Sequence, residues 1–137
     1  MGELRGEIPK DMVEGKAKLF LNFESRNALE DCMILCRFYQ QFIGWDGMKE
    51  IIKATTGMDL SQEDMETIAK RSTTTARRFN LREGLTRKDD TLPPRMFNDP
   101  IGPNKEFIVN RENLEIMLNE YYSLHGWDEN GIPPEEK

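Results

Sequence analysis

The sequence contains few of the residues that bind soft metals or act as nucleophiles. Its 137 residues include two cysteines and a single histidine. Cys32 and Cys36 lie in an apolar pattern, so a helix would hold both thiols on one face, in a geometry that disfavours a disulfide. Because there is no other cysteine and His125 lies far along the chain, a self-contained zinc site is not expected. The pattern alone indicates two reduced thiols packed in a core.

Long apolar runs and catalytic motifs are also absent. No stretch approaches the roughly 20 apolar residues of a membrane helix, and no signal-peptide pattern is present, so we expect a cytoplasmic protein. The net charge of -6 would repel duplex DNA or an anionic membrane. Without a Walker loop, a dinucleotide glycine motif, a nucleophile elbow or paired carboxylates, the chain displays no complete active site. His125 fits the last turn of a helix, where a cationic ring suits the helix dipole.

Positive charge is concentrated in one segment, residues 71–95. Seven basic and three acidic residues give this segment a charge of +4, against -10 for the rest of the chain. Its arginines can pair with nearby carboxylates, where each exposed pair contributes little. They can also dock on an acidic or phosphate-bearing surface, which suits the planar fork of arginine. The pattern leaves both interpretations open, but it lacks the interleaved aromatic residues expected of a nucleic-acid binder.

Length and composition predict one compact but polar all-α domain. A chain of this length can bury about 68% of its surface on folding, yet 37% of the residues are hydrophobic and 32% are charged. We expect residues 1–24 to form an irregular N-terminal segment with a short extended piece at residues 19–23. Residues 25–137 should form a helical domain of about four main helices, with a long proline-rich wrap over residues 85–110.

Capping residues and apolar spacing set the expected helix boundaries. The predicted helices are, in chain order, one from Ser25 to a stop at Gly44, one over Trp45–Thr56 capped by Gly57, one from its cap Ser61 toward Gly84, and one from its cap Asn110 to Gly126. The first is apolar on well over half of its circumference, which is typical of a buried helix. Within the wrap, Phe97 and Phe107 favour a stretch pinned to another surface.

Three stretches of the sequence are distinctive: ARRFNLREGLTRKDDTLPPR at residues 76–95, NLEIMLNEYY at 113–122 and GWDENGIP at 126–133. In this order they resemble the C-terminal end of the tungsten-containing aldehyde:ferredoxin oxidoreductase family, and the match spans most of residues 25–134. The resemblance implies an all-helical C-terminal domain. In that family it packs, with a second helical domain, on a β domain that cradles a tungsten bis-pyranopterin cofactor.

The resemblance gives Cys32 and Cys36 different roles. Family members carry an Asp-x-x-Gly-Leu-Cys motif, in which Asp and Leu contact one pterin and Cys is the fourth ligand of a [4Fe-4S] cluster. The counterpart here is DCMILC at residues 31–36. The resemblance therefore implies pterin contacts from Asp31 and Leu35 and a cluster ligand in Cys36, while Cys32 stays a core thiol. Ile34 replaces the glycine of the motif, which predicts a backbone that stays helical there.

Other parts of the family pattern are missing from the chain. The three remaining cluster cysteines, the β domain and the second pterin-binding motif are absent, so we expect the isolated chain to bind neither tungsten nor a stable cluster. It would be a fragment, a C-terminal domain or a separate subunit of the enzyme. The resemblance implies no catalytic residue in this chain, and its expected partners are the remaining domains or subunit, ferredoxin and a second copy in the full enzyme.

The resemblance also implies a reaction. In the whole enzyme an aldehyde and water would give a carboxylic acid, and the electrons would leave through the [4Fe-4S] cluster to ferredoxin. The alternative hypothesis is a stand-alone helical interaction module without redox activity. In that case both thiols would be core residues, and the basic segment would dock on an acidic partner.

Overall fold

The computed structural model describes residues 13–36, 38, 42–100, 102 and 108–135. These residues form helices and no strand, which confirms the all-α prediction. The main helices are α1 (Lys16–Cys32), α2 (Trp45–Thr56), α3 (Gln62–Arg82) and α5 (Arg111–His125), with a short 3-10 helix η2 (Arg87–Asp89) and a single turn α4 (Arg95–Asn98) between α3 and α5. None of the described helices is long and apolar enough to cross a membrane.

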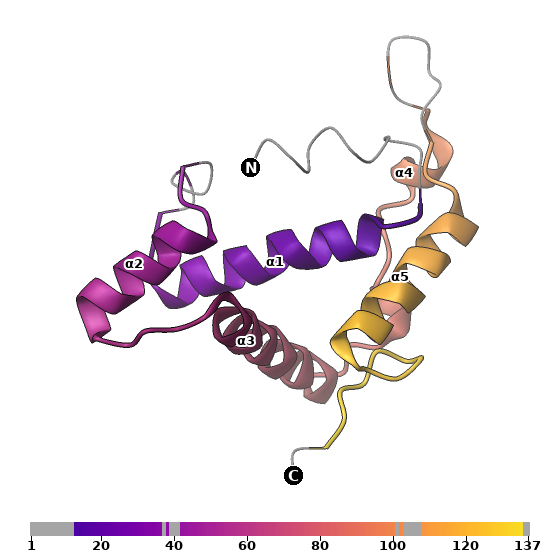
Figure 1. The fold of residues 1–137 in the computed structure, drawn as a ribbon. Coiled ribbons are helices and arrows are strands. Elements are labelled where there is room, and N and C mark those ends of the chain that lie inside the picture. The colour runs from indigo at the N-terminus through magenta and orange to yellow at the C-terminus, as the bar shows by residue number, and fades with distance from the viewer. Residues whose placement is uncertain (1–12, 37, 39–41, 101, 103–107, 136–137) are drawn as a thin grey trace.

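Helix α1 is the central element of the fold. It contacts both α3 and α5, while α2 packs on α3. Figure 1 shows α2 beside the C-terminal end of α1 and α5 near its N-terminal end. The main core lies between the first three helices and consists of Leu29, Met48, Ile52, Met65 and Ala69. Burial of these apolar side chains, each contributing on the order of 1 to 3 kcal/mol, holds α1, α2 and α3 together.

The predicted boundaries of α2, α3 and α5 are confirmed closely. Gly57 ends α2 with a left-handed backbone at φ 78°. Ser61 caps α3 through a reciprocal pair of hydrogen bonds with Asp64, and the side chain of Asn110 accepts two backbone N–H groups at the start of α5. These signals are local in the sequence, because each cap satisfies backbone groups within a few residues of itself.

The predicted first helix is wrong at both ends. Residues 19–23, expected to be extended, lie inside α1, and the helix ends at Cys32 instead of continuing toward Gly44. The early start is a tertiary effect, because residues 16–24 carry little helical signal but pack against α5 and bury Ala17. Residues 1–12 lie outside the described residues, so the remaining part of the predicted irregular segment stays a prediction.

The proline-rich wrap is pinned to the chain's own α5. Phe97 in α4 is buried, and the guanidinium group of Arg111 lies 4.0 Å from the centre of its ring. The backbone N–H of Val109 donates to the carbonyl of Met96 at 3.0 Å, which draws the two ends of the wrap together. Phe107, the second aromatic residue of the prediction, lies outside the described residues.

Candidate functional site

The C-terminal end of α1 forms a tight left-handed turn. The N–H of Ile34 donates to the carbonyl of Asp31 at 3.1 Å, and the N–H of Leu35 donates to the carbonyl of Glu30 at 3.0 Å. This pair of bonds is the Schellman motif, which satisfies the last carbonyls of a helix and turns the chain away from its axis. The residues after Ile34 therefore leave the helix direction.

Ile34 occupies the turn position that is usually reserved for glycine. Its φ angle is 58°, the one positive value among the described non-glycine residues. A left-handed backbone costs an L-amino acid roughly 1–2 kcal/mol, and a β-branched residue is rare there. The prediction that Ile34 keeps the backbone helical is therefore wrong: the chain turns here as the glycine of the family motif would allow, although the residue is isoleucine.

The turn places the predicted site residues together at one exposed end of the molecule. Asp31 and Cys36 are exposed, and Leu35 is half-buried. Cys32 is exposed too, with its thiol 3.8 Å from the hydroxyl oxygen of Ser72. The prediction of Cys32 as a core thiol is wrong, because the short α1 ends at this residue and leaves it at the surface.

The donor set at this end is that of a shared metal site. In the part of the chain that the structure describes, no three side chains from histidine, cysteine, aspartate and glutamate come together as a metal site would require. A [4Fe-4S] cluster takes four thiolates. The exposed thiol of Cys36 can therefore serve as one ligand, provided that the other three come from elsewhere.

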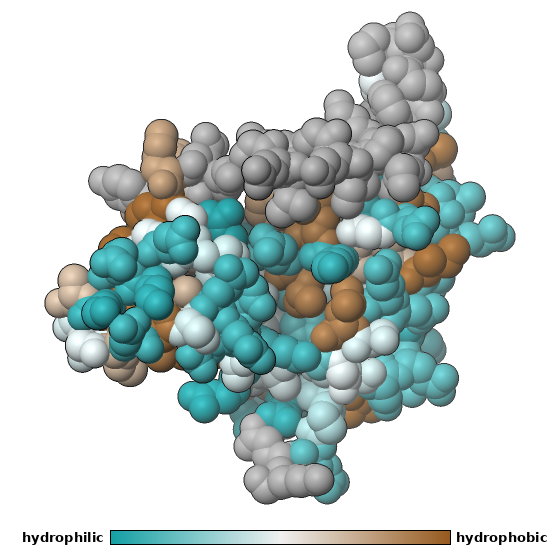
Figure 2. Space-filling view, viewed as in Figure 1, coloured by the Kyte–Doolittle hydropathy of each residue, from teal (hydrophilic) through white to brown (hydrophobic). Residues whose placement is uncertain are grey.

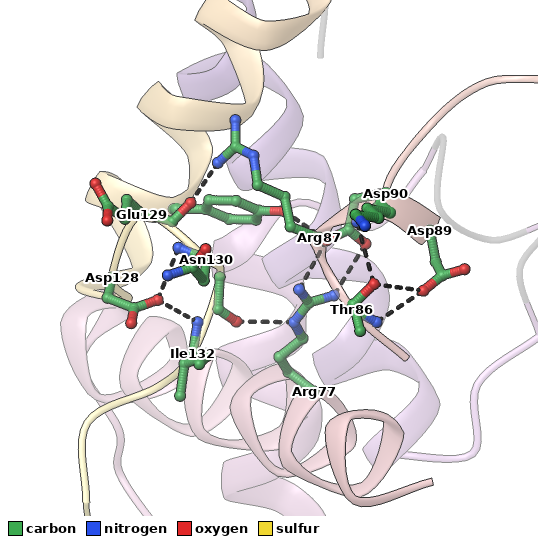
Figure 3. A network of polar contacts seen from close by, with 12 residues as sticks. Arg77, Thr86, Arg87, Asp89, Asp90, Asp128, Glu129, Asn130 and Ile132 are labelled. Carbon is green, nitrogen blue, oxygen red and sulfur yellow. Dashed lines mark hydrogen bonds and ion pairs between the residues drawn. The ribbon is translucent and has the colours of Figure 1, made fainter. Parts of the chain in front are cut away.

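A second constellation lies at the opposite end of α3 and centres on Arg77 (Figure 3). This buried guanidinium group donates to both carboxylate oxygens of Asp90, at 2.9 and 2.7 Å, and its Nε donates to the carbonyl of Gly131 at 2.9 Å. The hydroxyl of Tyr122 donates to the same carboxylate. Arg77 thus ties α3, the loop after η2, α5 and the C-terminal turn into one unit.

The charges of this constellation are compensated internally. Burial, followed by the hydrogen bond to Asp90, raises the pKa of Tyr122 to about 12. For Arg77, burial acts to lower the pKa, but the hydrogen bond and charge of Asp90 outweigh it and raise the pKa above its ordinary value. A buried, bidentate arginine and carboxylate of this kind fixes geometry more than it adds net stability.

Arg87 repeats the pattern on the surface next to this constellation. Its guanidinium group donates to the carboxylate of Glu115 at 2.6 Å, to the side-chain oxygen of Asn119 at 2.8 Å and to the backbone carbonyl of Glu129. Of the two interpretations of the basic segment, intramolecular pairing therefore holds for Arg77 and Arg87. The side chains of Arg71, Lys88 and Arg95 are in the exposed class.

A third polar group joins α1 to α5. The carboxylate of Glu24 accepts the hydroxyl of Tyr121 at 2.6 Å and lies 2.9 Å from Nε2 of His125. The buried ring of His125 stacks on Trp127, with 4.4 Å between ring centres. Burial, with help from Glu24, raises the pKa of Tyr121. Sequence analysis missed this contact because it placed Glu24 in an irregular segment.

The largest cleft of the described residues lies away from the α1 turn. It has a volume of about 770 Å³ and separates α1 from α5, where Figure 2 shows a brown, hydrophobic surface. Apolar side chains line most of it, among them Phe20, Phe23, Leu114 and Met117. Asp31, Leu35 and Cys36 do not border this cleft, so the candidate site is an exposed surface and not a closed pocket.

Comparison with known proteins gives a consistent family. Residues 3–137 match the sequence model described as aldehyde ferredoxin oxidoreductase, domains 2 and 3. The tungsten-containing aldehyde ferredoxin oxidoreductase of Pyrococcus abyssi is 40% identical over 132 residues, which cover 94% of this chain and 21% of the relative. The corresponding protein of Thermococcus kodakarensis is 39% identical over the same shares of the two chains.

More distant relatives have other activities. The aliphatic sulfonate oxidoreductase, WOR-like subunit, of Pyrococcus furiosus is 33% identical over 116 residues, covering 80% of this chain and 18% of the relative. A solved structure of the active site complex BamBC of benzoyl coenzyme A reductase matches with a TM-score of 0.74 at 23% identity, over 93% of this chain and 19% of that chain. This likeness shows a shared fold. The chain spans about a fifth of the length of the curated relatives it matches.

Proposed function

The chain belongs to the aldehyde ferredoxin oxidoreductase family, and from this we propose that it is the helical part of a tungsten-dependent oxidoreductase that supplies one ligand to an electron-transfer cluster. The observation that carries the proposal is the left-handed turn at Ile34. It ends α1 at the point where the family motif has glycine. Asp31, Leu35 and Cys36 are thereby brought to one exposed end of the chain.

Cys36 would hold one iron of a [4Fe-4S] cluster through its thiolate. Its exposure fits this role, because the other three cysteine ligands must approach from outside the chain. Three ligands from another part of the enzyme and one from this chain would also tie the two parts together. Packing and hydrogen bonds around the Cys36 thiolate would then help to set the reduction potential.

Asp31 and Leu35 would contact the neighbouring pterin. Asp31 lies in the last turn of α1 with its carboxylate at the surface, so it can accept N–H donors of a ring that approaches the helix end. Leu35 is half-buried and follows the turn directly, which gives the same ring an apolar contact. The tungsten–pterin group, when bound, supplies the oxidation of an aldehyde with water to a carboxylic acid, with the electrons passing onward to ferredoxin.

The test is the removal of the Cys36 thiolate in the whole enzyme. We expect Cys36→Ser to lower the iron content of anaerobically purified enzyme and to weaken or abolish the electron paramagnetic resonance signal of the reduced cluster. Cys32→Ser is the matched control, because this thiol is also exposed and lies four positions away; it should leave both measurements unchanged. Unchanged iron and an unchanged signal in Cys36→Ser would refute the cluster assignment.

The isolated chain gives an independent check. Because it offers a single candidate ligand at this site, we expect the purified 137-residue chain to hold no tungsten and no stable cluster. About four iron atoms per chain after anaerobic purification would contradict this expectation. The alternative of an interaction module without redox activity placed both thiols in a core, whereas both are exposed.

A further inference from the structure

The end of α1 exposes three large apolar side chains that no described part of the chain covers. Ile34 is 92% exposed, Phe38 88% and Phe42 83%, the highest values among the described large hydrophobic residues. We call these three residues the α1-end patch. Cys36 lies between them in the sequence. Isolated apolar residues are normal on a surface, but a group of this exposure marks a site of contact with another molecule or domain.

Ile34 adds an argument from strain. Its backbone is left-handed, so glycine at this position would remove a cost of roughly 1–2 kcal/mol. Within the chain the exposed side chain returns almost nothing for that cost. Strained backbone conformations persist where surrounding contacts or function require them. The compensating contact for Ile34 must therefore lie outside the 137 residues.

We propose that the α1-end patch anchors this chain on the cofactor-bearing remainder of the enzyme, with Ile34 inserted into an apolar pocket of that remainder. This inference rests on the proposed function. Ile34 would act as a residue particular to this chain, since the family motif has glycine in its place. The remainder can lie on the same polypeptide or on a second one.

Two observations favour this occupant over a second copy of the chain. The curated relatives have about four-fifths of their length outside the matched part, and the three missing cluster ligands must come from such a body and approach Cys36 within the patch. A stable dimer needs about 800 Å² of buried surface on each partner. Three side chains fall well short of that area, whereas a contact that also encloses a cofactor continues beyond them.

The proposal predicts that one substitution has opposite effects on two forms of the protein. Ile34→Gly relieves strain in the isolated chain and should raise its thermal midpoint by about 3–5 °C. In the anaerobically purified enzyme the same substitution removes a buried side chain, which corresponds to a roughly tenfold or greater loss of affinity between the two parts. The midpoint of the enzyme should therefore fall by several degrees.

Ile34→Val is the matched control, because it keeps both the left-handed strain and most of the apolar side chain. Both midpoints of this variant should stay close to those of the native protein. Ile34→Asn is a second test variant, since asparagine tolerates the left-handed region but brings a polar group to the contact. It should behave like Ile34→Gly. A rise in the midpoint of the enzyme, or no change, with either test variant would overturn the proposal.

Carbene footprinting followed by mass spectrometry reads the patch directly. Ile34 and Phe42 should be labelled strongly in the isolated chain and protected in the enzyme. Labelling in the enzyme at the level of the isolated chain would overturn the proposal. Protection already present in the isolated chain, with a dimeric mass by sedimentation, would assign a second copy as the occupant and would equally overturn it.

The same samples separate this inference from the proposed function. In enzyme carrying Cys36→Ser, loss of iron with a still protected patch supports both. Unchanged iron with a protected patch refutes the cluster ligand and leaves the docking surface standing. An accessible patch in native enzyme refutes the docking surface, whatever the iron content.

Discussion

The two ends of this small domain differ in how completely they satisfy their own side chains. At one end Arg77, Asp90, Tyr122 and Trp127 close around the C-terminal turn, and the guanidinium group of Arg77 lies within 6 Å of the Tyr122 and Trp127 rings. We call this group the aromatic end. At the other end the α1-end patch is exposed around a strained turn. The comparison shows which surface the chain stabilises by itself and which it leaves for a partner.

Positive φ angles make the contrast specific. The aromatic end uses Gly131, at φ 69°, exactly where a side chain could not fit: a Cβ atom there would lie 2.6 Å from Nη2 of Arg77 and 2.8 Å from the Tyr122 ring. The α1 end uses Ile34 at a similar angle in open solvent. The first choice of residue serves the folded chain, whereas the second costs it stability.

The strongest way to break the comparison is to remove the charge at the aromatic end. Arg77→Met would leave the largely buried carboxylate of Asp90 without its bidentate partner and the carbonyl of Gly131 without its donor. Removing one partner of a buried ion pair costs about 3 kcal/mol or more. We expect a loss of this size in the free energy of unfolding of the isolated chain, measured by urea denaturation.

Arg82→Met on the same helix is the control for this prediction. Arg82 lies 3.6 Å from Glu83, and both side chains are more than half exposed, so the loss should be within about 0.5 kcal/mol. Equal effects of the two substitutions would mean that the aromatic end contributes no more to stability than an ordinary surface.

A smaller effect should follow from adding one methyl group at Gly131. Gly131→Ala combines the cost of a left-handed alanine with steric overlap against Arg77 and Tyr122, and we expect a loss of about 2–3 kcal/mol. Gly57→Ala is the matched control. It has a φ of 78° but no neighbouring atom within 4 Å of the added Cβ, so it should cost about 1 kcal/mol. The difference between the two free energies of unfolding isolates the steric part.

How far the sequence predicts this molecule depends on the range of the signal. The caps at Gly57, Ser61 and Asn110 act on backbone groups a few residues away, and the helices that they bound were predicted almost to the residue. The limits of α1 were not predicted. Its first two turns are helical because they pack on α5, and its end depends on Ile34 adopting a conformation that its residue type disfavours.

The candidate site follows the same division. The residues of the DCMILC segment could be named from the family motif alone, but their exposure could not, because apolar spacing suggested a longer, buried helix. The contacts of Glu24 with Tyr121 and His125 join residues about 100 positions apart. No local pattern marks such a pair, since both partners read individually as ordinary surface or helix-end residues.

The next prediction sharpens the comparison from the exposed side. Phe38→Ser combined with Phe42→Ser removes two large apolar side chains that are more than four-fifths exposed. Because these side chains bury little surface in the chain, we expect the free energy of unfolding to change by no more than about 0.5 kcal/mol. Urea denaturation measures this directly. A loss of 2 kcal/mol or more would show that the phenyl rings already have partners within the chain.

The smallest expected effect is a pH dependence confined to the aromatic end. Tyr122 has a folded-state pKa raised from 10.0 to about 12, by burial and by its hydrogen bond to Asp90. The unfolded phenol therefore ionises first, so the stabilising contribution of the protonated hydroxyl is complete below pH 10 and is lost as the pH rises toward 12. Over pH 9 to 10.5 only the beginning of this loss should appear, as a downward slope in the free energy of unfolding. Tyr122→Phe should reduce that slope without abolishing it, because the pKa of Tyr121 is raised as well, whereas the paired Phe38→Ser and Phe42→Ser substitutions should leave it unchanged. An identical slope in Tyr122→Phe and in the native chain would show that the hydroxyl of Tyr122 ionises alike in the folded and unfolded states.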